Sequence, residues 1–124
     1  MTAAAAFLAV ALAGGAGAVC RLLLGAGTKA LFPGWYPVGT LIINVSGSLL
    51  LGFATGLALA HVLPAEWRAV VGTGFLGGYT TFSTASADVV QLARDGHRLA
   101  AAFHGLGMFV AAVAAAGTGM WLAS

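Results

Sequence analysis

The chain has 124 residues, of which 60% are hydrophobic and only 6% are charged, and its net charge is +2. Soluble globular domains carry roughly 25% charged residues, so this deficit indicates a protein that exposes most of its surface to a lipid bilayer. The five Lys and Arg residues are scattered along the chain, which excludes the clustered basic face of a nucleic-acid-binding protein.

The first predicted element is a membrane-spanning helix from about Ala3 to Leu24, since a span needs about 20 apolar residues. It lacks the basic start of a signal peptide, so we expect it to stay in the membrane. Arg21 places a positive charge either at the lipid interface or in an aqueous vestibule that attracts anions. Cys20 is the only cysteine, which excludes an intrachain disulfide. Small residues that allow close helix contact precede it at Gly14, Gly15 and Gly17.

Residues Gly25 to Pro37 are predicted to form the first loop, and a second helix is predicted from about Val38 to Val62. Asn44 is unusual in this helix because its amide carries two donors, which are costly to leave unpaired in hydrocarbon. It can form an interhelical hydrogen bond or donate to a passing anion. Small and polar residues recur every four positions along the same face, at Thr40, Asn44, Ser48, Gly52 and Gly56.

The third predicted segment, Ala69 to about Ala93, contains the stretch GTGFLGGYTTFSTASAD from Gly72 to Asp88. Its glycines favour helix poorly, and a dense row of hydroxyls follows them. A bilayer tolerates irregular backbone only where it is buried in protein or lines a polar cavity. We therefore predict a broken helix with function at the break, followed by a loop from Arg94 to Arg98 and a fourth helix from about Leu99 to Leu122.

An interrupted membrane helix offers two kinds of ion contact. Unwound carbonyls can coordinate a cation, and freed amides with nearby hydroxyls can meet an anion. Phe82 either packs in the core or presents the positive edge of its ring to an anion. The glycine-rich stretch lacks the lysine of a nucleotide site, and no nucleophile and base pair is present, so we expect no enzyme activity.

Three motifs in the same order resemble the Fluc/CrcB family of fluoride channels. They are GGAGAVCR at residues 14–21, GTLIINVSGSLLLG at 39–52 and GFLGGYTTFSTAS at 74–86. The resemblance implies an all-α membrane protein in which residues 1–124 form a single domain of four transmembrane helices with a broken third helix. It also implies an antiparallel dual-topology dimer that passively exports fluoride across the cell membrane.

The resemblance assigns roles to particular residues. It implies a structural sodium ion held by the backbone carbonyls of Gly77 and Thr80. The implied fluoride pore uses the Asn44 amide, the Phe82 ring edge, hydroxyls, a vestibule arginine and a fourth-helix position; its residues are Arg21, Asn44, Phe82, Ser83, Thr84 and His104.

The chain departs from the family pattern at four positions. Ala85 stands where a second phenylalanine is usual, and His104 stands where a tyrosine is expected. His104 is either a packed neutral histidine or a polar pore group. Met108 and Ala112 replace two common hydroxyl residues.

Three alternatives to a homodimeric channel remain at this point. The predicted loops place Lys29, Arg94 and Arg98 on one side of the membrane and Arg68 on the other, which indicates a preferred orientation. That asymmetry suggests a paralogous partner and one degraded pore. A small multidrug-type exporter would need a carboxylate in the membrane, and Asp88 is the one acid inside a span, where we expect an interfacial or helix-supporting role. A purely structural subunit is a third option.

Overall fold

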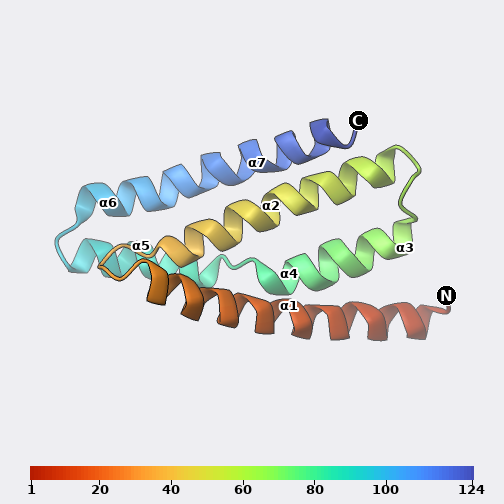
Figure 1. Ribbon diagram of the computed structural model, residues 1–124, viewed down its shortest axis with the longest axis horizontal. Helices are drawn as coiled ribbons and strands as arrows, with labels where there is room; N and C mark the ends of the chain where they lie inside the picture. Colours follow the sequence, from red (N-terminus) through yellow and green to blue (C-terminus); the bar gives the residue numbers. More distant parts are fainter.

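The computed structural model describes residues 1–124 and contains helices but no strands. The chain runs back and forth in antiparallel passes, and both termini lie at the same end of the molecule (Figure 1). The first two passes are single helices, α1 (Ala3–Leu31) and α2 (Val38–Leu59). The later passes are divided into shorter segments: α3 (Ala65–Arg68), η1 (Ala69–Leu76), α4 (Gly77–Tyr79) and α5 (Ser83–Arg94), then α6 (Arg98–Ala102), η2 (Phe103–Gly107) and α7 (Met108–Leu122).

Three stretches are long and apolar enough to cross a membrane, namely Ala3–Leu31, Val38–Leu59 and Arg98–Leu122. These correspond to the first, second and fourth predicted spans, which are confirmed as helices of membrane-crossing length. The third predicted segment contains no single helix of that length, because Thr80 to Phe82 separate α4 from α5.

The prediction that Gly25 begins a loop was wrong, since α1 continues to Leu31. The hydroxyl of Thr28 donates to the carbonyls of Leu24 and Gly25 at 2.9 and 3.0 Å. This places a polar side chain on a membrane helix without leaving its donor unpaired. The helix ends shortly before Pro33, because a proline disfavours helical geometry in the residue before it.

The other helix ends differ from the predictions by a few residues around proline and glycine. α2 ends at Leu59, short of Val62, and His61 follows in a left-handed conformation with φ of 58°. Pro64 then precedes the first turn of α3, where a proline is well tolerated. Glu66 lies within α3.

Close helix contact depends on glycine at two crossings. A Cβ at Gly17 would collide with the Phe75 carbonyl of η1, and a Cβ at Gly78 would collide with the Gly14 carbonyl of α1. A Cβ at Gly52 of α2 would likewise collide with Ala116 of α7. The predicted packing role of the small residues is confirmed at these positions, whereas Gly15 has no neighbour within 4 Å.

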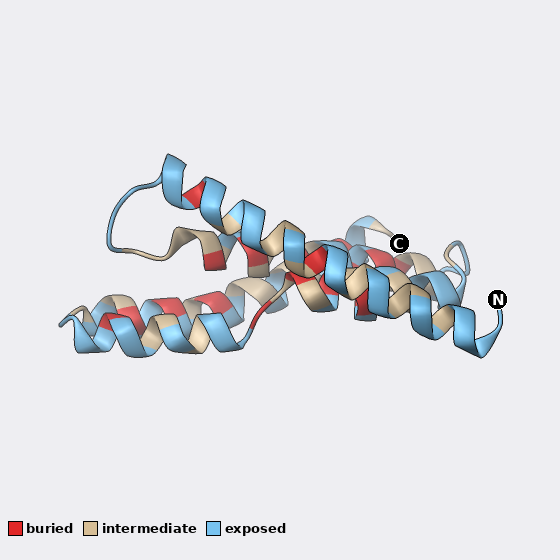
Figure 2. Cartoon of the chain, turned by 90° about the horizontal axis from the view of Figure 1, so that it is seen from below, coloured by how far each residue is buried: buried red, intermediate tan, exposed pale blue.

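The distribution of buried residues suits a bilayer. A small central cluster contains Ile43, Leu76 and Tyr79, while many large apolar side chains are exposed. Most of the helix surface is exposed or only partly buried (Figure 2). Leu31 is 77% exposed and Phe82 is 87% exposed. Lipid solvates such side chains without the free-energy cost that water imposes, so the outward apolar surface agrees with a membrane protein.

Candidate functional site

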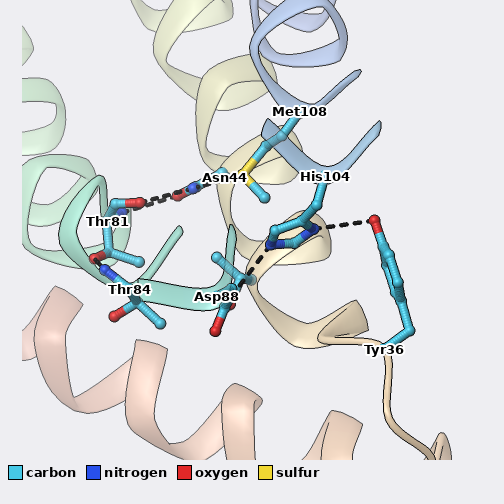
Figure 3. Close-up of polar contacts among 8 residues, drawn as sticks. Tyr36, Asn44, Thr81, Thr84, Asp88, His104 and Met108 are labelled. Atoms are coloured by element: carbon cyan, nitrogen blue, oxygen red, sulfur yellow. Dashed lines mark hydrogen bonds and ion pairs between the residues drawn. The ribbon is translucent and has the colours of Figure 1, made fainter. Parts of the chain in front are cut away.

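The third pass is interrupted directly after Tyr79, where Thr80 adopts an extended conformation with φ of −78° and ψ of 157°. Asn44 on α2 pairs with the backbone of the next residue, Thr81. The Thr81 amide donates to Asn44 Oδ1 at 2.8 Å, and Asn44 Nδ2 donates to the Thr81 carbonyl at 2.8 Å (Figure 3). One side chain thus satisfies both polar groups of a residue that lies outside the helices.

This pairing removes a regular helical hydrogen bond from Gly77. In an α-helix each amide donates to the carbonyl four residues earlier, so the Thr81 amide would donate to the Gly77 carbonyl. Here that amide donates to Asn44. The Thr84 amide would donate to the Thr80 carbonyl, but it donates to the Thr81 hydroxyl at 3.1 Å. The two carbonyls that the resemblance assigns to sodium therefore both lose their helical partners.

The Asn44 amide has no spare donor in this chain. Its second Nδ2 hydrogen points to the Met108 sulfur, at an Nδ2 to Sδ distance of 3.2 Å. Met108 is 5% exposed, so its thioether fills the space beside the amide. Of the two uses considered for Asn44, the structure contains the interhelical hydrogen bonds; donation to an anion stays a prediction.

A cavity of about 320 Å³ lies on one side of the break. It brings together three of the predicted pore residues, Asn44, Phe82 and His104. All four positions at which the chain departs from the family pattern line this same cavity: Ala85, His104, Met108 and Ala112. The departures are thus concentrated in one place in the fold, although Ala85 lies on the third pass and the other three lie on the fourth.

A larger cavity of about 690 Å³ lies on the other side and contains the remaining predicted pore residues, Arg21, Ser83 and Thr84. Lys29 also lines it, and its lining includes no carboxylate. Arg21 Nε is buried without a hydrogen-bond partner. Two cationic side chains among hydroxyl groups give this cavity a positive potential that favours anions. Thr81 lines both cavities, so the break lies between them.

A chain of hydrogen bonds lies beside the break and includes the side chains of Tyr36, His104 and Asp88 (Figure 3). The Tyr36 hydroxyl lies 3.0 Å from His104 Nδ1, and His104 Nε2 lies 3.3 Å from Asp88 Oδ2. Thr40 donates to the same Asp88 oxygen at 2.7 Å. His104 is 0% exposed, and its place in η2, a wide helical turn, directs it into this chain.

Sequence reasoning missed this network. Tyr36 reads as an interfacial aromatic residue and Thr40 as part of a packing face, while Asp88 was expected at an interface or in support of a helix. The structure gives Asp88 the supporting role, since it joins α2 to η2 through Thr40 and His104. One signal was available: an acid and a histidine in apolar segments both need partners, so pairing them satisfies both.

Burial raises the pKa of Tyr36, which lies in the loop between α1 and α2, and the negative charge of Asp88 raises it further. Both effects disfavour the phenolate. The phenol therefore keeps its proton at neutral pH and can donate it in a hydrogen bond to the His104 ring.

The chain was compared with known proteins. A family model described as "CrcB-like protein, Camphor Resistance (CrcB)" matches residues 8–120. The chain is 56% identical over 115 residues to fluoride-specific ion channel FluC 1 of Leifsonia xyli subsp. xyli, which covers 93% of this chain and 84% of that protein. It is 48% identical over 116 residues to FluC 2 of Cutibacterium acnes, and the aligned residues cover 93% of this chain and 94% of that protein. It is 49% identical over 108 residues to FluC of Tolumonas auensis, and the aligned residues cover 83% of this chain and 84% of that protein.

Proposed function

Because this chain belongs to the CrcB-like protein family, we propose that it is a subunit of a fluoride-specific ion channel. The chain is a membrane protein and a channel subunit, not an enzyme. The family assignment also removes the small multidrug-type exporter as an alternative. The finer proposal is passive export of fluoride from the cytoplasm through the plasma membrane, which lowers the toxicity of the ion.

The single observation that carries the mechanism is the arrangement of the two cavities on either side of the break. Arg21 and Lys29 line the larger cavity, where their charge draws anions from water. Fluoride is small and strongly hydrated, so a pore must replace its water with closely spaced donors. The Ser83 and Thr84 hydroxyls lie at the start of α5, where the backbone amides of the first turn add positive partial charge. From there the proposed path enters the second cavity between Asn44 and Phe82.

A structural sodium ion is part of this proposal. The carbonyls of Gly77 and Thr80 lack helical partners, and unwound carbonyls at a helix break are suitable ligands for Na⁺. Gly77 is exposed and Thr80 is half-buried in the single chain, so both are within reach of an ion outside it. When bound, sodium neutralises these carbonyl dipoles and holds the break in shape. Replacing Na⁺ by a large organic cation in the buffer is expected to lower the thermal stability of the folded protein.

An antiparallel dual-topology dimer completes the proposed assembly. Two carbonyls do not fill the coordination shell of a sodium ion, so a second subunit would supply the remaining ligands. Phe82 is 87% exposed in the single chain, and a partner subunit would cover its ring. In this arrangement the residues from Ala65 to Arg94 form the third of four membrane crossings as a broken helix.

A heterodimer with one degraded pore is the second candidate, and one observation favours it. The cavity that contains Asn44 and Phe82 is also where the four departures gather, and the Met108 sulfur takes the Asn44 hydrogen that an anion would need. In that case a paralogous subunit of opposite orientation would provide the conducting path.

Fluoride efflux from liposomes that contain this chain alone tests the proposal, with chloride efflux as the selectivity control. Asn44→Asp and Phe82→Ile should each reduce fluoride efflux strongly. Phe7→Ile is the matched control, since Phe7 is also an exposed ring, at 75%, but lines neither cavity. Fluoride-selective efflux that only the first two substitutions reduce supports a conducting homodimer. Efflux that appears only after a paralogous subunit is added supports the heterodimer, and chloride efflux as fast as fluoride efflux would overturn the channel proposal.

A further inference from the structure

The network of Tyr36, Thr40, Asp88 and His104 connects the two cavities. Tyr36 and Thr40 line the larger cavity, His104 lines the smaller one, and Asp88 bonds to both Thr40 and His104. A titratable histidine therefore lies in the wall of the smaller cavity and pairs with the Asp88 carboxylate, which lines neither cavity but has a polar connection to the larger one through Thr40. The predicted pore residues include His104 but not Asp88, and the pore prediction assigns no role to the pairing of the two.

Each hydrogen bond in the network has one donor and one acceptor when Asp88 is a carboxylate and His104 is neutral. The Thr40 hydroxyl and the His104 Nε2 hydrogen both donate to Asp88 Oδ2, at 2.7 and 3.3 Å. The other ring nitrogen, Nδ1, is then an acceptor for the Tyr36 hydroxyl at 3.0 Å. The raised pKa of Tyr36 agrees with this direction, because the phenol must keep its proton to donate it. In this state the network carries one negative charge.

The same side chains accommodate a second protonation state. A proton added at His104 Nδ1 turns the ring into an imidazolium, and the Tyr36 oxygen becomes the acceptor of the Nδ1 hydrogen. The imidazolium and the Asp88 carboxylate then form an ion pair whose net charge is zero. Tyr36 is half-buried and lines the larger cavity, so water there gives the proton a route to the ring.

We propose that His104 and Asp88 form a proton-binding site, and that loading it with a proton speeds the passage of fluoride through the smaller cavity. This inference rests on the proposed channel function. An unneutralised carboxylate beside the cavity repels an anion, and screening is weak in a low-dielectric interior. Proton binding removes that net negative charge, so the pore conducts fluoride faster in acid.

The other ionisable groups near the network are few. α7, which continues from η2, and α2, which packs against α7, carry no ionisable side chain. Arg98 begins α6 and Arg94 ends α5, both exposed, while Arg21 and Lys29 face the larger cavity. His97 is a second imidazole near the network and stacks on Trp35, with ring centroids 3.9 Å apart, so it needs its own control.

Fluoride efflux from liposomes at pH 7.5 and pH 5.5 tests the proposal. Protein-free liposomes at each pH measure the leak of uncharged hydrogen fluoride, which is subtracted. We expect efflux to rise several-fold in acid for the unmodified chain and for His97→Gln. Asp88→Asn removes the charge permanently and should be fast at both pH values, whereas His104→Gln keeps the charge without the proton site and should be slow at both. Equal efflux at the two pH values in the unmodified chain, or an unchanged pH dependence in both network variants, would overturn the proposal.

A second measurement does not depend on conduction by the chain alone. The chain has three histidines, so a His61→Gln, His97→Gln variant leaves His104 as the only imidazole. Its ring nitrogens are followed by ¹⁵N NMR in lipid between about pH 5 and 8. The proposal expects the neutral ring with hydrogen on Nε2 at the upper end, a reversible change to imidazolium at the lower end, and a different titration after Asp88→Asn. A His104 ring that does not titrate would overturn the proposal, whether or not fluoride flux is detected. A ring that titrates without fluoride flux would instead count against the channel function of the homodimer.

Discussion

The side-chain amide of Asn44 pairs with both backbone polar groups of Thr81, at 2.8 Å in each direction. This contact joins α2 to the break in the third pass, and it determines which carbonyls are left free. Because the Thr81 amide donates to Asn44, it does not donate to the Gly77 carbonyl. The Thr84 amide likewise donates to the Thr81 hydroxyl and not to the Thr80 carbonyl. The proposed pore residue Asn44 and the carbonyls of the proposed sodium site are separate in the sequence and are thus linked by one side chain.

Replacing Asn44 by alanine is expected to destabilise the protein. The substitution leaves the Thr81 amide and carbonyl without partners in an apolar surrounding, and each such group costs about 1–3 kcal/mol. Thermal unfolding in detergent, followed by circular dichroism, measures the change. Ser48→Ala is the matched control, because Ser48 lies one turn further along α2 and lines the same cavity without contacting the break. Equal melting temperatures for the two variants would contradict the bracing role of Asn44.

Replacing Met108 by serine should increase fluoride efflux. The thioether is a weak acceptor that occupies the second Asn44 hydrogen, and a shorter side chain frees space and restores a hydroxyl beside the amide. Met108→Ala frees similar space without the hydroxyl, so it separates steric relief from added polarity. Removal of this buried side chain should also lower stability by about 2–5 kcal/mol in the alanine variant. If neither substitution changes efflux, Met108 does not limit the path.

Adding a methyl group at Gly17 should disrupt the contact between α1 and the third pass. A Cβ there meets the Phe75 backbone, which cannot move as a flexible side chain can, and overpacking typically costs about 1–3 kcal/mol. Gly15→Ala is the control two residues away, where a Cβ meets nothing within 4 Å. Alanine favours helix over glycine, so we expect this variant to be as stable as the unmodified chain or slightly more stable. Chemical denaturation in detergent compares the two.

The phenol of Tyr36 is expected to ionise at a higher pH than free tyrosine. Burial is the main cause of its raised pKa, and the Asp88 charge adds to it. The folded-state pKa lies above the unfolded value of about 10, so the protonated phenol of Tyr36 contributes to the stability of the fold. This contribution is complete below pH 10 and is lost as the pH rises through the folded-state pKa.

Phenolate absorbance tests this in a Tyr79→Phe variant, where Tyr36 is the only tyrosine. Adding Asp88→Asn should lower the titration midpoint of Tyr36, because it removes the smaller of the two causes. A midpoint at the value of free tyrosine in the folded protein would contradict the buried donor role.

Much of the architecture could be predicted from local sequence. The apolar segments of membrane length gave three helices that the structure confirms, and the family resemblance is confirmed by the match over residues 8–120. The boundary of α1 was wrong because glycine and lysine at residues 25–29 looked like a loop. In the fold, Thr28 bonds to the preceding turn and keeps the chain helical up to Leu31.

The sequence by itself determined that the chain belongs in a bilayer, because too few of its residues are charged to cover a water-soluble domain. It also determined where helix propensity is poor, in the glycine and hydroxyl stretch that ends at Thr84. Only the tertiary structure decided which polar groups meet. Asn44 and Thr81 are 37 residues apart, and Tyr36 and His104 are 68 apart. Such pairs form when helices pack, because hydrocarbon solvates no polar group and each one must find its partner on another segment.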